Sequence, residues 1–225
     1  EWSNAQLFYG LYKRVQSFWG NSELEARGVP TEGERAVLQP LVDQGLLSAE
    51  ILTDEAVMAP VSGQRQLDRK NLRRASQLMD EAGWRVNADG MREKDGQVFT
   101  LEVLDSSPAF DRITNPMIEN MKALGIDARL NRVDTAQESE RTRAYDFDVT
   151  THSMRMGFEP SSGLEQYFGT KAMDQSSRNL MGLSDPAVDA LIEKVVRAQS
   201  KAELNTNIRA LDRVLRAKRF WIPQW

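Results

Sequence analysis

The chain has 225 residues, 40% hydrophobic and 28% charged, a composition typical of a globular protein with one large or two modest domains. Its formal net charge of -4 argues against a nucleic-acid partner, because phosphate binding depends on a clustered positive surface. The absence of cysteine excludes disulfides, thiolate nucleophiles and cysteine zinc sites, and no apolar run approaches the length of a membrane span.

Residues 1–66 predict two helices separated by irregular chain. Thr31 followed by Glu34 forms a capping box, a pattern in which each of two residues bonds to the other's backbone N–H at a helix start. The predicted segments are a helix over 1–9 closed by Gly10, an extended aromatic stretch over 11–19, a loop over 21–30, a helix from 31 toward Pro40 and a connector over 44–66.

Residues 68–151 predict alternating helices and strands. Gly83 and Gly125 stand where two of these helices stop, and Leu78 is among the residues expected to face inward. The elements are a helix over 68–82, a hairpin over 84–92, a strand over 98–104, a helix over 112–124, a strand over 126–133, a helix over 135–143 and a strand over 145–151. This order predicts an α/β fold, with βαβ units and a mixed or parallel sheet covered by helices.

Basic residues cluster around the start of the 68–82 helix. They are Arg65, Arg69, Lys70, Arg73 and Arg74. No aromatic residue lies among them, and acidic residues stand nearby in the sequence. We therefore expect a solvated helix face here, not a nucleic-acid site.

Residues 179–225 predict a helical hairpin followed by an aromatic strand. Asp185 before Pro186, and Ser200 before Glu203, mark two helix starts. Apolar residues recur at helical spacing after each start, so the helices should pack as an antiparallel pair. Basic residues at the end of the second helix suit the negative end of its dipole. They are Arg213, Arg216, Lys218 and Arg219.

The segment from residue 220 to Trp225 reads as a strand without a partner in this sequence. We therefore expect the chain to be part of a larger protein, and we expect its function to be that of the larger protein.

His152 is the single histidine, and with Asp146 and Asp148 it suggests a metal or acid–base cluster on one strand face. Side chains along one face are about 7 Å apart, so Asp146 and His152 would lie roughly 20 Å apart. Zinc, with bonds of about 2 Å, could not bind all three. A metal-dependent domain or enzyme is therefore the alternative reading, disfavoured by geometry.

The segment from His152 to Glu159 is the most suggestive candidate site. It follows the carboxyl end of a predicted strand, where open α/β sheets place their ligands. Methionines in it suit a permissive binding surface, because they adapt their shape. A partly buried loop whose apolar residues merely cover the sheet explains the pattern equally well.

The run from Asn179 to Ile192, N-L-M-G-L-S-D-P-A-V-D-A-L-I, resembles the N…G…S-D-P…D-x-L-I signature of extracellular solute-binding proteins of the peptide and nickel class. A helix ending at Trp84, another ending near Ile126 and the run Tyr145–Asp148 occur in the order typical of that family. The resemblance is strongest to the YejA-type oligopeptide-binding subgroup. It covers essentially all 225 residues and corresponds to one lobe of the family's longer chain.

The resemblance implies a periplasmic-binding-protein-like lobe, with a mixed sheet flanked by helices in the type II solute-binding fold of cluster C. Residues 1–225 would form mainly the C-terminal lobe of a two-lobed periplasmic receptor, with the first lobe and a C-terminal tail missing. Such a receptor, a monomer when intact, closes on an oligopeptide by a hinge motion and delivers it to the membrane permease of an ABC importer. The resemblance implies no catalysis, cofactor, metal or membrane-spanning segment. A ligand-sensing or interaction domain built on the same lobe remains a further alternative.

The resemblance places ligand contacts in residues 152–159 and in aromatic residues after the first helix. The candidates are His152, Ser153, Met154, Arg155, Met156, Phe158, Glu159, Tyr12, Phe18 and Trp19. We expect Arg155 to face the cleft and meet ligand carboxylate or carbonyl groups. Some oligopeptide binders carry an aspartate for the peptide's amine a few residues before the proline matching Pro160. Met156 is the nearest equivalent here, so the amine clamp is not implied and ligands without a free amine are admitted.

Overall fold

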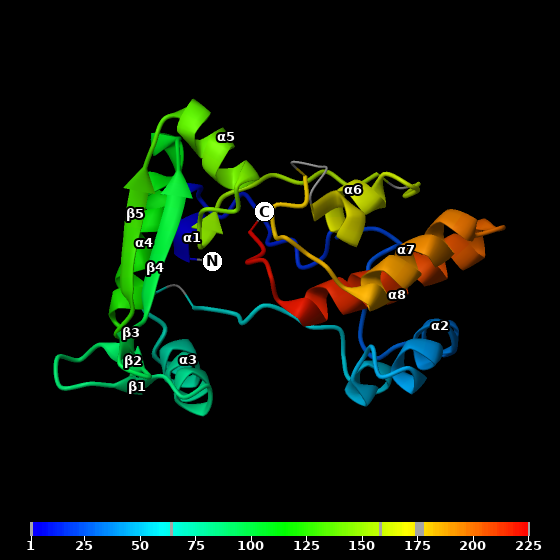
Figure 1. The fold of residues 1–225 in the computed structure, drawn as a ribbon, viewed down its shortest axis with the longest axis horizontal. Coiled ribbons are helices and arrows are strands. Elements are labelled where there is room, and N and C mark those ends of the chain that lie inside the picture. Colours follow the sequence, from blue (N-terminus) through cyan, green and yellow to red (C-terminus); the bar gives the residue numbers. More distant parts are fainter. Residues whose placement is uncertain (1, 64, 158, 174–177, 225) are drawn as a thin grey trace. The chain divides into compact units, whose positions relative to one another are not determined.

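The computed structural model describes residues 2–63, 65–157, 159–173 and 178–224 (Figure 1). The chain divides into two compact units, each with its own hydrophobic core. Unit 1 comprises Glu1–Lys13 and Pro60–His152, and unit 2 comprises Arg14–Ala59 and Ser153–Trp225. The chain therefore crosses from one unit to the other three times.

A three-stranded parallel sheet forms the centre of unit 1. Strand β4 (Thr100–Asp105) lies between β5 (Asp127–Arg132) and β6 (Val149–Thr150). Helix α4 (Asp111–Lys122) connects β4 to β5 and packs on β5, as Figure 1 shows. Residues buried between helix and sheet are Val103, Ile118, Ile126 and Ala128. This β4–α4–β5 unit confirms the predicted βαβ arrangement.

Strand β6 is shorter than predicted, because residues 145–146 close the preceding helix instead. Helix α5 (Thr135–Arg143) ends as predicted, and Tyr145 then takes a left-handed φ of 55°. The N–H of Asp146 donates to the carbonyl of Arg141 at 2.9 Å. Pairing with β4 is therefore limited to Val149 and Thr150.

A small antiparallel sheet precedes the parallel one. Its strands, in order, are β1 (Arg85–Val86), β2 (Arg92–Lys94) and β3 (Gln97–Val98). The turn after α4 packs against it at Gly125, whose φ is 84° and where an added Cβ would lie 2.7 Å from the Gly90 carbonyl oxygen. Only glycine fits there, because the backbones touch. The predicted helix stop therefore also has a packing role.

Helix α3 (Arg69–Glu81) begins at the N-cap Asp68, whose carboxylate accepts the N–H of Asn71 at 2.8 Å. Its basic residues are exposed, as predicted for a solvated face. The prediction that Leu78 faces inward is wrong, since its side chain is 45% exposed. The inward face of α3 is narrower than the apolar pattern indicated.

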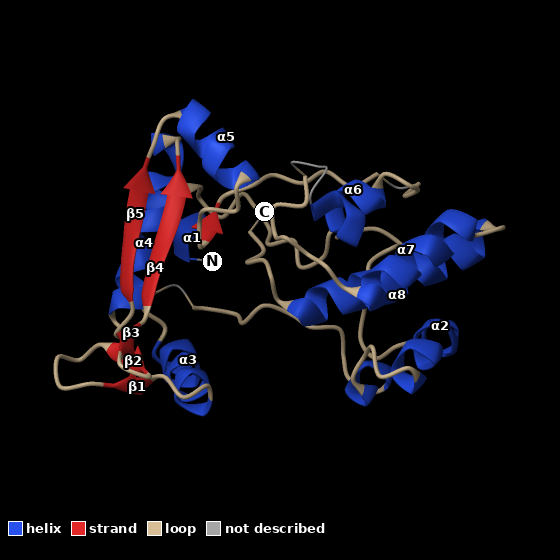
Figure 2. Ribbon diagram, in the orientation of Figure 1, coloured by secondary structure: helices blue, strands red, loops and turns tan. Residues whose placement is uncertain are grey.

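Unit 2 is built around α7 (Pro186–Arg197) and α8 (Lys201–Lys218), which pack against each other (Figure 2). Asp185 accepts the N–H groups of Ala187 and Val188, and Ser200 accepts that of Glu203 at 3.2 Å. The predicted helix starts are thus confirmed. Helix α2 (Glu32–Asp43) packs on α8 and helix α6 (Leu164–Phe168) on α7. The remaining helical segments are α1 (Trp2–Leu7), η1 (Ala49–Leu52), η2 (Pro108–Phe110) and η3 (Thr170–Met173).

Buried ion pairs and hydrogen bonds connect the first stretch of unit 2, Arg14–Ala59, to α8. The Glu34 carboxylate, 1% exposed, accepts bonds from Arg213 at 3.0 Å and Arg209 at 3.1 Å. Arg213 also donates to the carbonyl oxygens of Gly28 and Asp54. Thr31 caps α2 through the N–H of Glu34, so one half of the predicted capping box is correct. The other half is replaced by the ion pair with Arg213.

Asp212 forms the second buried centre on α8. Its carboxylate accepts Ser17 Oγ–H at 2.7 Å, the N–H of Ala26 at 3.0 Å and Arg216 at 3.3 Å. Burial raises the pKa of Asp212, and these donors oppose the increase. From the sequence, Arg213 and Arg216 were expected to interact with the negative end of the α8 dipole. In the structure both are buried and bond to carboxylates and loop carbonyls.

The strand predicted after residue 219 is not formed, and Trp225 lies outside the described residues. Arg219 takes a left-handed φ of 54° and ends α8. Gln224 then accepts one backbone hydrogen bond, from Val15 at 2.9 Å. Phe220 and Trp221 stack on Phe18, with ring centroids 6.0 and 4.2 Å away. Aromatic packing therefore replaces the predicted strand pairing.

No helix within the described residues combines the length and apolar character required to cross a bilayer.

Replacing Glu34 with Gln should destabilise unit 2 strongly, because it leaves Arg213 buried without a counter-charge. Removing one partner of a buried ion pair costs about 3–5 kcal/mol, measurable by urea unfolding. The matched control is Glu193→Gln, which breaks the exposed 2.6 Å pair with Arg197 and should change stability little. Equal losses in the two variants would contradict a stabilising role for the buried pair.

Glu102 on β4 should make unit 1 sensitive to acid. A hydrogen bond from Asn131, followed by the ion pair with Arg141 at 2.7 Å, lowers the pKa of Glu102 below its ordinary 4.5. Its stabilisation is therefore present above pH 4.5 and is lost as the pH falls through the lower folded-state pKa. We expect Glu102→Gln to be less stable at pH 7 and to lose part of this acid dependence, measured as unfolding free energy against pH. The exposed Glu140→Gln serves as control and should follow the parent protein; an unchanged acid slope in Glu102→Gln would refute the assignment.

Candidate functional site

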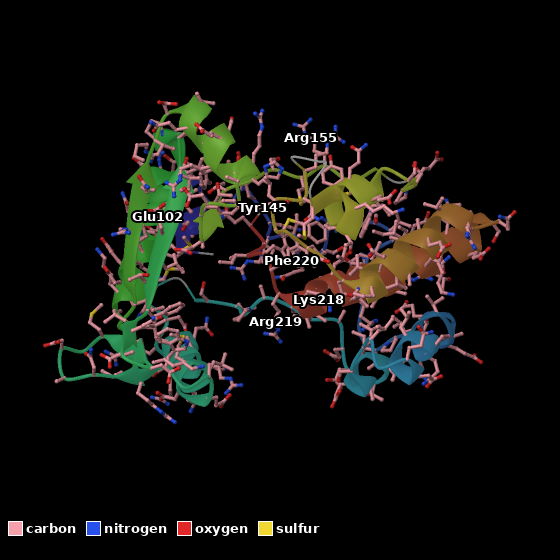
Figure 3. All side chains as sticks on the ribbon, viewed as in Figure 1. Glu102, Tyr145, Arg155, Lys218, Arg219 and Phe220 are labelled. Carbon is pink, nitrogen blue, oxygen red and sulfur yellow. The ribbon has the colours of Figure 1, made fainter. Side chains whose placement is uncertain are left out.

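The candidate segment, residues 152–159, follows β6 at the carboxyl end of the parallel sheet. His152 is the last residue of unit 1 and Ser153 the first of the second stretch of unit 2. Exposure alternates along the segment: Ser153 and Arg155 are exposed, whereas Met154 and Met156 are half-buried against the core of unit 2. Figure 3 shows Arg155 on this segment. The period of two is that of an extended chain, with its polar side chains outward.

The main chain of this segment is unpaired within the described part of the protein. Residues 152–157 make no backbone hydrogen bond among the described residues. Peptide N–H and C=O groups are strong hydrogen-bonding groups and require a partner wherever they are buried. An extended segment of this kind can therefore pair with the main chain of a ligand.

Two further polar groups belong to the segment. Burial lowers the pKa of His152 below its ordinary value, so its ring is neutral at pH 7 and can both donate and accept a hydrogen bond. Glu159 is exposed, and its charge helps Glu23 to raise the pKa of Lys201. Phe158, a predicted ligand contact, lies outside the described residues.

The aromatic candidates occupy two different places. Tyr12 belongs to unit 1, where it is 46% exposed and meets Phe8 edge to face. Phe18 lies in the aromatic cluster of unit 2, and Trp19 is 3% exposed in the core of that unit. The structure thus gathers Phe18, Trp19 and the two methionines around one core, and it leaves Tyr12 in the other unit.

The turn carrying these aromatics rests on a residue that the sequence analysis missed. Ser17 Oγ accepts the N–H of Trp19 at 2.9 Å while donating to the buried Asp212. The indole Nε1 of Trp19 is buried and has no hydrogen-bond partner within the described part of the chain. The single sequence signal for this arrangement was a carboxylate at position 212 among the apolar residues of α8.

The alternative metal or acid–base cluster has its carboxylates engaged elsewhere. Asp146 forms an ion pair with Arg141 at 2.7 Å. Asp148 accepts the N–H of Glu102 at 2.8 Å, and Figure 3 places Glu102 on β4. No group of three potential metal ligands occurs among the described residues. Both carboxylates therefore have structural roles.

The signature that carries the family resemblance is structural as well. The buried Asn179 amide donates to the carbonyls of Gly169 and Leu183 and accepts the N–H of Leu183. Asp189 accepts the N–H of Thr170 at 2.9 Å. With Asp185 as the cap of α7, these residues hold the loop before α7 in place.

Comparison with known proteins agrees with this architecture. A family model described as "Bacterial extracellular solute-binding proteins, family 5 Middle" matches residues 1–175. The "Probable peptide-binding protein YejA" of Agrobacterium fabrum is 40% identical over 224 residues, which cover 99% of this chain and 36% of that protein. The chain spans about a third of the length of the curated relatives it matches.

Solved structures show the same fold at low sequence identity. The oligopeptide-binding protein AppA from Bacillus subtilis, in complex with a nonapeptide, has a TM-score of 0.58 at 16% identity. The alignment covers 84% of this chain and 38% of the AppA chain. NikZ from Campylobacter jejuni, in complex with Ni(L-His), has a TM-score of 0.60 at 16% identity. That alignment covers 99% of this chain and 48% of the NikZ chain. The predicted α/β lobe of type II is thereby confirmed. The chain belongs to the bacterial extracellular solute-binding proteins of family 5.

Proposed function

We propose that the chain is part of the substrate-binding component of an ABC-type peptide importer, which captures oligopeptides in the periplasm and delivers them to a membrane permease. The observation that carries this proposal is the stretch of residues 152–157, which follows a parallel strand, alternates in exposure like an extended chain and makes no backbone hydrogen bond among the described residues. Main-chain pairing suits ligands of many sequences, because every peptide offers the same N–H and C=O groups. The peptide-binding relative and the nonapeptide complex of AppA support this ligand class.

Within this proposal the ten candidate residues divide into two roles. The exposed side chains of His152, Ser153, Arg155 and Glu159 contact the ligand from the 152–159 segment, and Tyr12 of unit 1 is a separate proposed contact. The half-buried or buried Phe18, Trp19, Met154 and Met156 support the segment from the core of unit 2. Phe158 remains a proposed ligand contact on sequence grounds.

The same proposal assigns one side of the binding site to these 225 residues. The curated relatives are about three times longer, and two-lobed receptors hold their ligand by contacts to both lobes after hinge closure. Binding involves no catalytic step in this proposal. The chain by itself is therefore expected to bind peptides more weakly than about 1 μM, the affinity that corresponds to roughly -8 kcal/mol.

Arg155→Ala should weaken peptide binding. A hydrogen bond to a charged group contributes about 1.5–3 kcal/mol, or roughly ten- to a hundredfold in affinity. Calorimetric titration of the chain together with the flanking sequence its gene encodes would measure this loss for peptides with free and with amidated carboxyl ends. A larger loss for the free carboxylate assigns Arg155 to that group.

The control for this experiment is Arg143→Ala, which removes an exposed arginine of α5 and should leave affinity unchanged. Equal affinities of Arg155→Ala and the parent protein would contradict the site assignment.

Titration with nickel–histidine is a second experiment, motivated by the fold of NikZ and the neutral His152 ring. If the protein binds nickel–histidine but no peptide, and His152→Ala abolishes that binding, the ligand is a metal chelate and the peptide proposal is wrong.

Stability measurements should separate the two roles. Trp19→Ala removes a buried aromatic side chain and should cost about 3–5 kcal/mol, measured by thermal or urea unfolding. Arg155→Ala should change stability by less than about 0.5 kcal/mol, because an exposed side chain makes few contacts in the fold. A large loss in Arg155→Ala would mean that this side chain supports the fold, not a ligand.

A further inference from the structure

The outer face of helix α3 carries two parallel rows of exposed side chains. Lys70, Arg74 and Leu78 are spaced by four residues, and so are Arg69 and Arg73. Residues four apart lie one above the other on a helix, so the four cations form a continuous patch about one and a half turns long. We call Arg69, Lys70, Arg73 and Arg74 the basic patch.

Most of the positive charge of this patch faces solvent. Arg74 pairs with Glu81 at 3.2 Å, but the two side chains are 58% and 62% exposed, and such pairs bind weakly. Among the described residues, Arg69 and Arg73 take part in no ion pair, and Lys70 has Asp68 as its neighbouring charge.

The nearby carboxylates are largely committed to the fold of unit 1. Asp68 caps α3 through the N–H of Asn71. Asp80 is held by the buried Arg92 at 2.6 Å and by Arg85 at 3.6 Å. The charge of Asp80 is thus neutralised by arginines outside the basic patch, whereas Asp68 keeps its charge beside Lys70 and offsets part of the patch.

Exposed apolar side chains occur on this helix face and in the chain before it. Leu78, 45% exposed, ends the row of Lys70 and Arg74, and Leu67, 42% exposed, stands just before Asp68, the N-cap of α3. In the neighbouring small sheet, Val86 on β1 is 56% exposed. Peripheral membrane proteins combine exposed cations with exposed apolar side chains. The cations bind anionic lipid headgroups, and the apolar side chains insert at the boundary with the acyl chains.

We propose that this face of α3 docks the protein on an anionic phospholipid surface. The chain as a whole carries a net charge of -4 and would be repelled by such a surface, so attraction must come from a local patch. Each basic residue close to an anionic bilayer strengthens binding by about fivefold. This surface is distinct from the 152–159 segment, and its function does not depend on the identity of the ligand.

The test is co-sedimentation of the chain with vesicles of phosphatidylglycerol and phosphatidylcholine, compared with phosphatidylcholine alone. We expect binding to the anionic vesicles only, and its loss in about 1 M salt, where the screening length falls to roughly 3 Å. The double variant Arg69→Gln/Arg73→Gln should weaken binding by roughly thirtyfold. Glutamine keeps the helix propensity high, and far-UV circular dichroism confirms that the variant is folded.

The matched control is Arg143→Gln/Lys171→Gln, which makes the same change in net charge at exposed positions of α5 and η3 and should bind like the parent. Leu78→Gln, which keeps the charge, should weaken binding by a smaller factor. Equal weakening in control and test variants would overturn the proposal, and so would the absence of binding to anionic vesicles. Tighter binding to soluble polyglutamate than to vesicles would replace the lipid surface with an acidic protein partner.

Discussion

The buried charges of α8 are the constraint on which unit 2 depends. Glu34 and Asp212 are almost completely buried, and their partners, Arg213 and Arg216, are buried with them. A buried charge is tolerated only when it is paired and hydrogen-bonded, so each of these groups requires its partner in one position. Through Arg213 and Arg216 the requirement extends to the carbonyls of Gly28, Asp54, Ala26 and Val57. Chain segments without helix or strand of their own are thereby held on a helix about 160 to 190 residues away in sequence.

This anchoring continues into the aromatic part of unit 2. Asp212 holds Ser17, and Ser17 holds the backbone of Trp19, so the turn that carries Phe18 is oriented by a carboxylate on α8. Phe18 then stacks on Trp221, which follows the end of the same helix. The half-buried Met154 and Met156 rest against this core. The exposed side chains of Ser153 and Arg155 thus stand beside methionines that pack on this core, and packed support of this kind keeps a binding segment in one geometry.

The elements of regular structure were predictable because their signals are local. Both bounds of α5 and the starts of α7 and α8 agree with the predictions, since caps and apolar stripes lie within or next to each helix. The strand expected over 145–151 was too long, because Tyr145 closes α5 in a left-handed turn that hydrophobic pattern does not reveal. The prediction of a strand after residue 219 was wrong because aromatic residues are common both in strands and in aromatic clusters. Here Phe220 and Trp221 stack on Phe18, which is distant in sequence, and form a cluster.

The candidate segment shows the same division. Its place after a strand could be read from the sequence, whereas the inward turn of both methionines and the outward turn of Arg155 depend on the core beneath them. In the sequence, Asp146 and Asp148 suggested a metal or acid–base cluster with His152. In the structure Asp146 pairs with Arg141 and Asp148 accepts the N–H of Glu102, so both carboxylates stabilise the fold. The sequence by itself determined the family, the α/β class and the order of helices and strands, because these follow from local spacing and motif order. The tertiary structure alone decided which charges are buried and paired, because burial is a property of segments brought together from opposite ends of the chain.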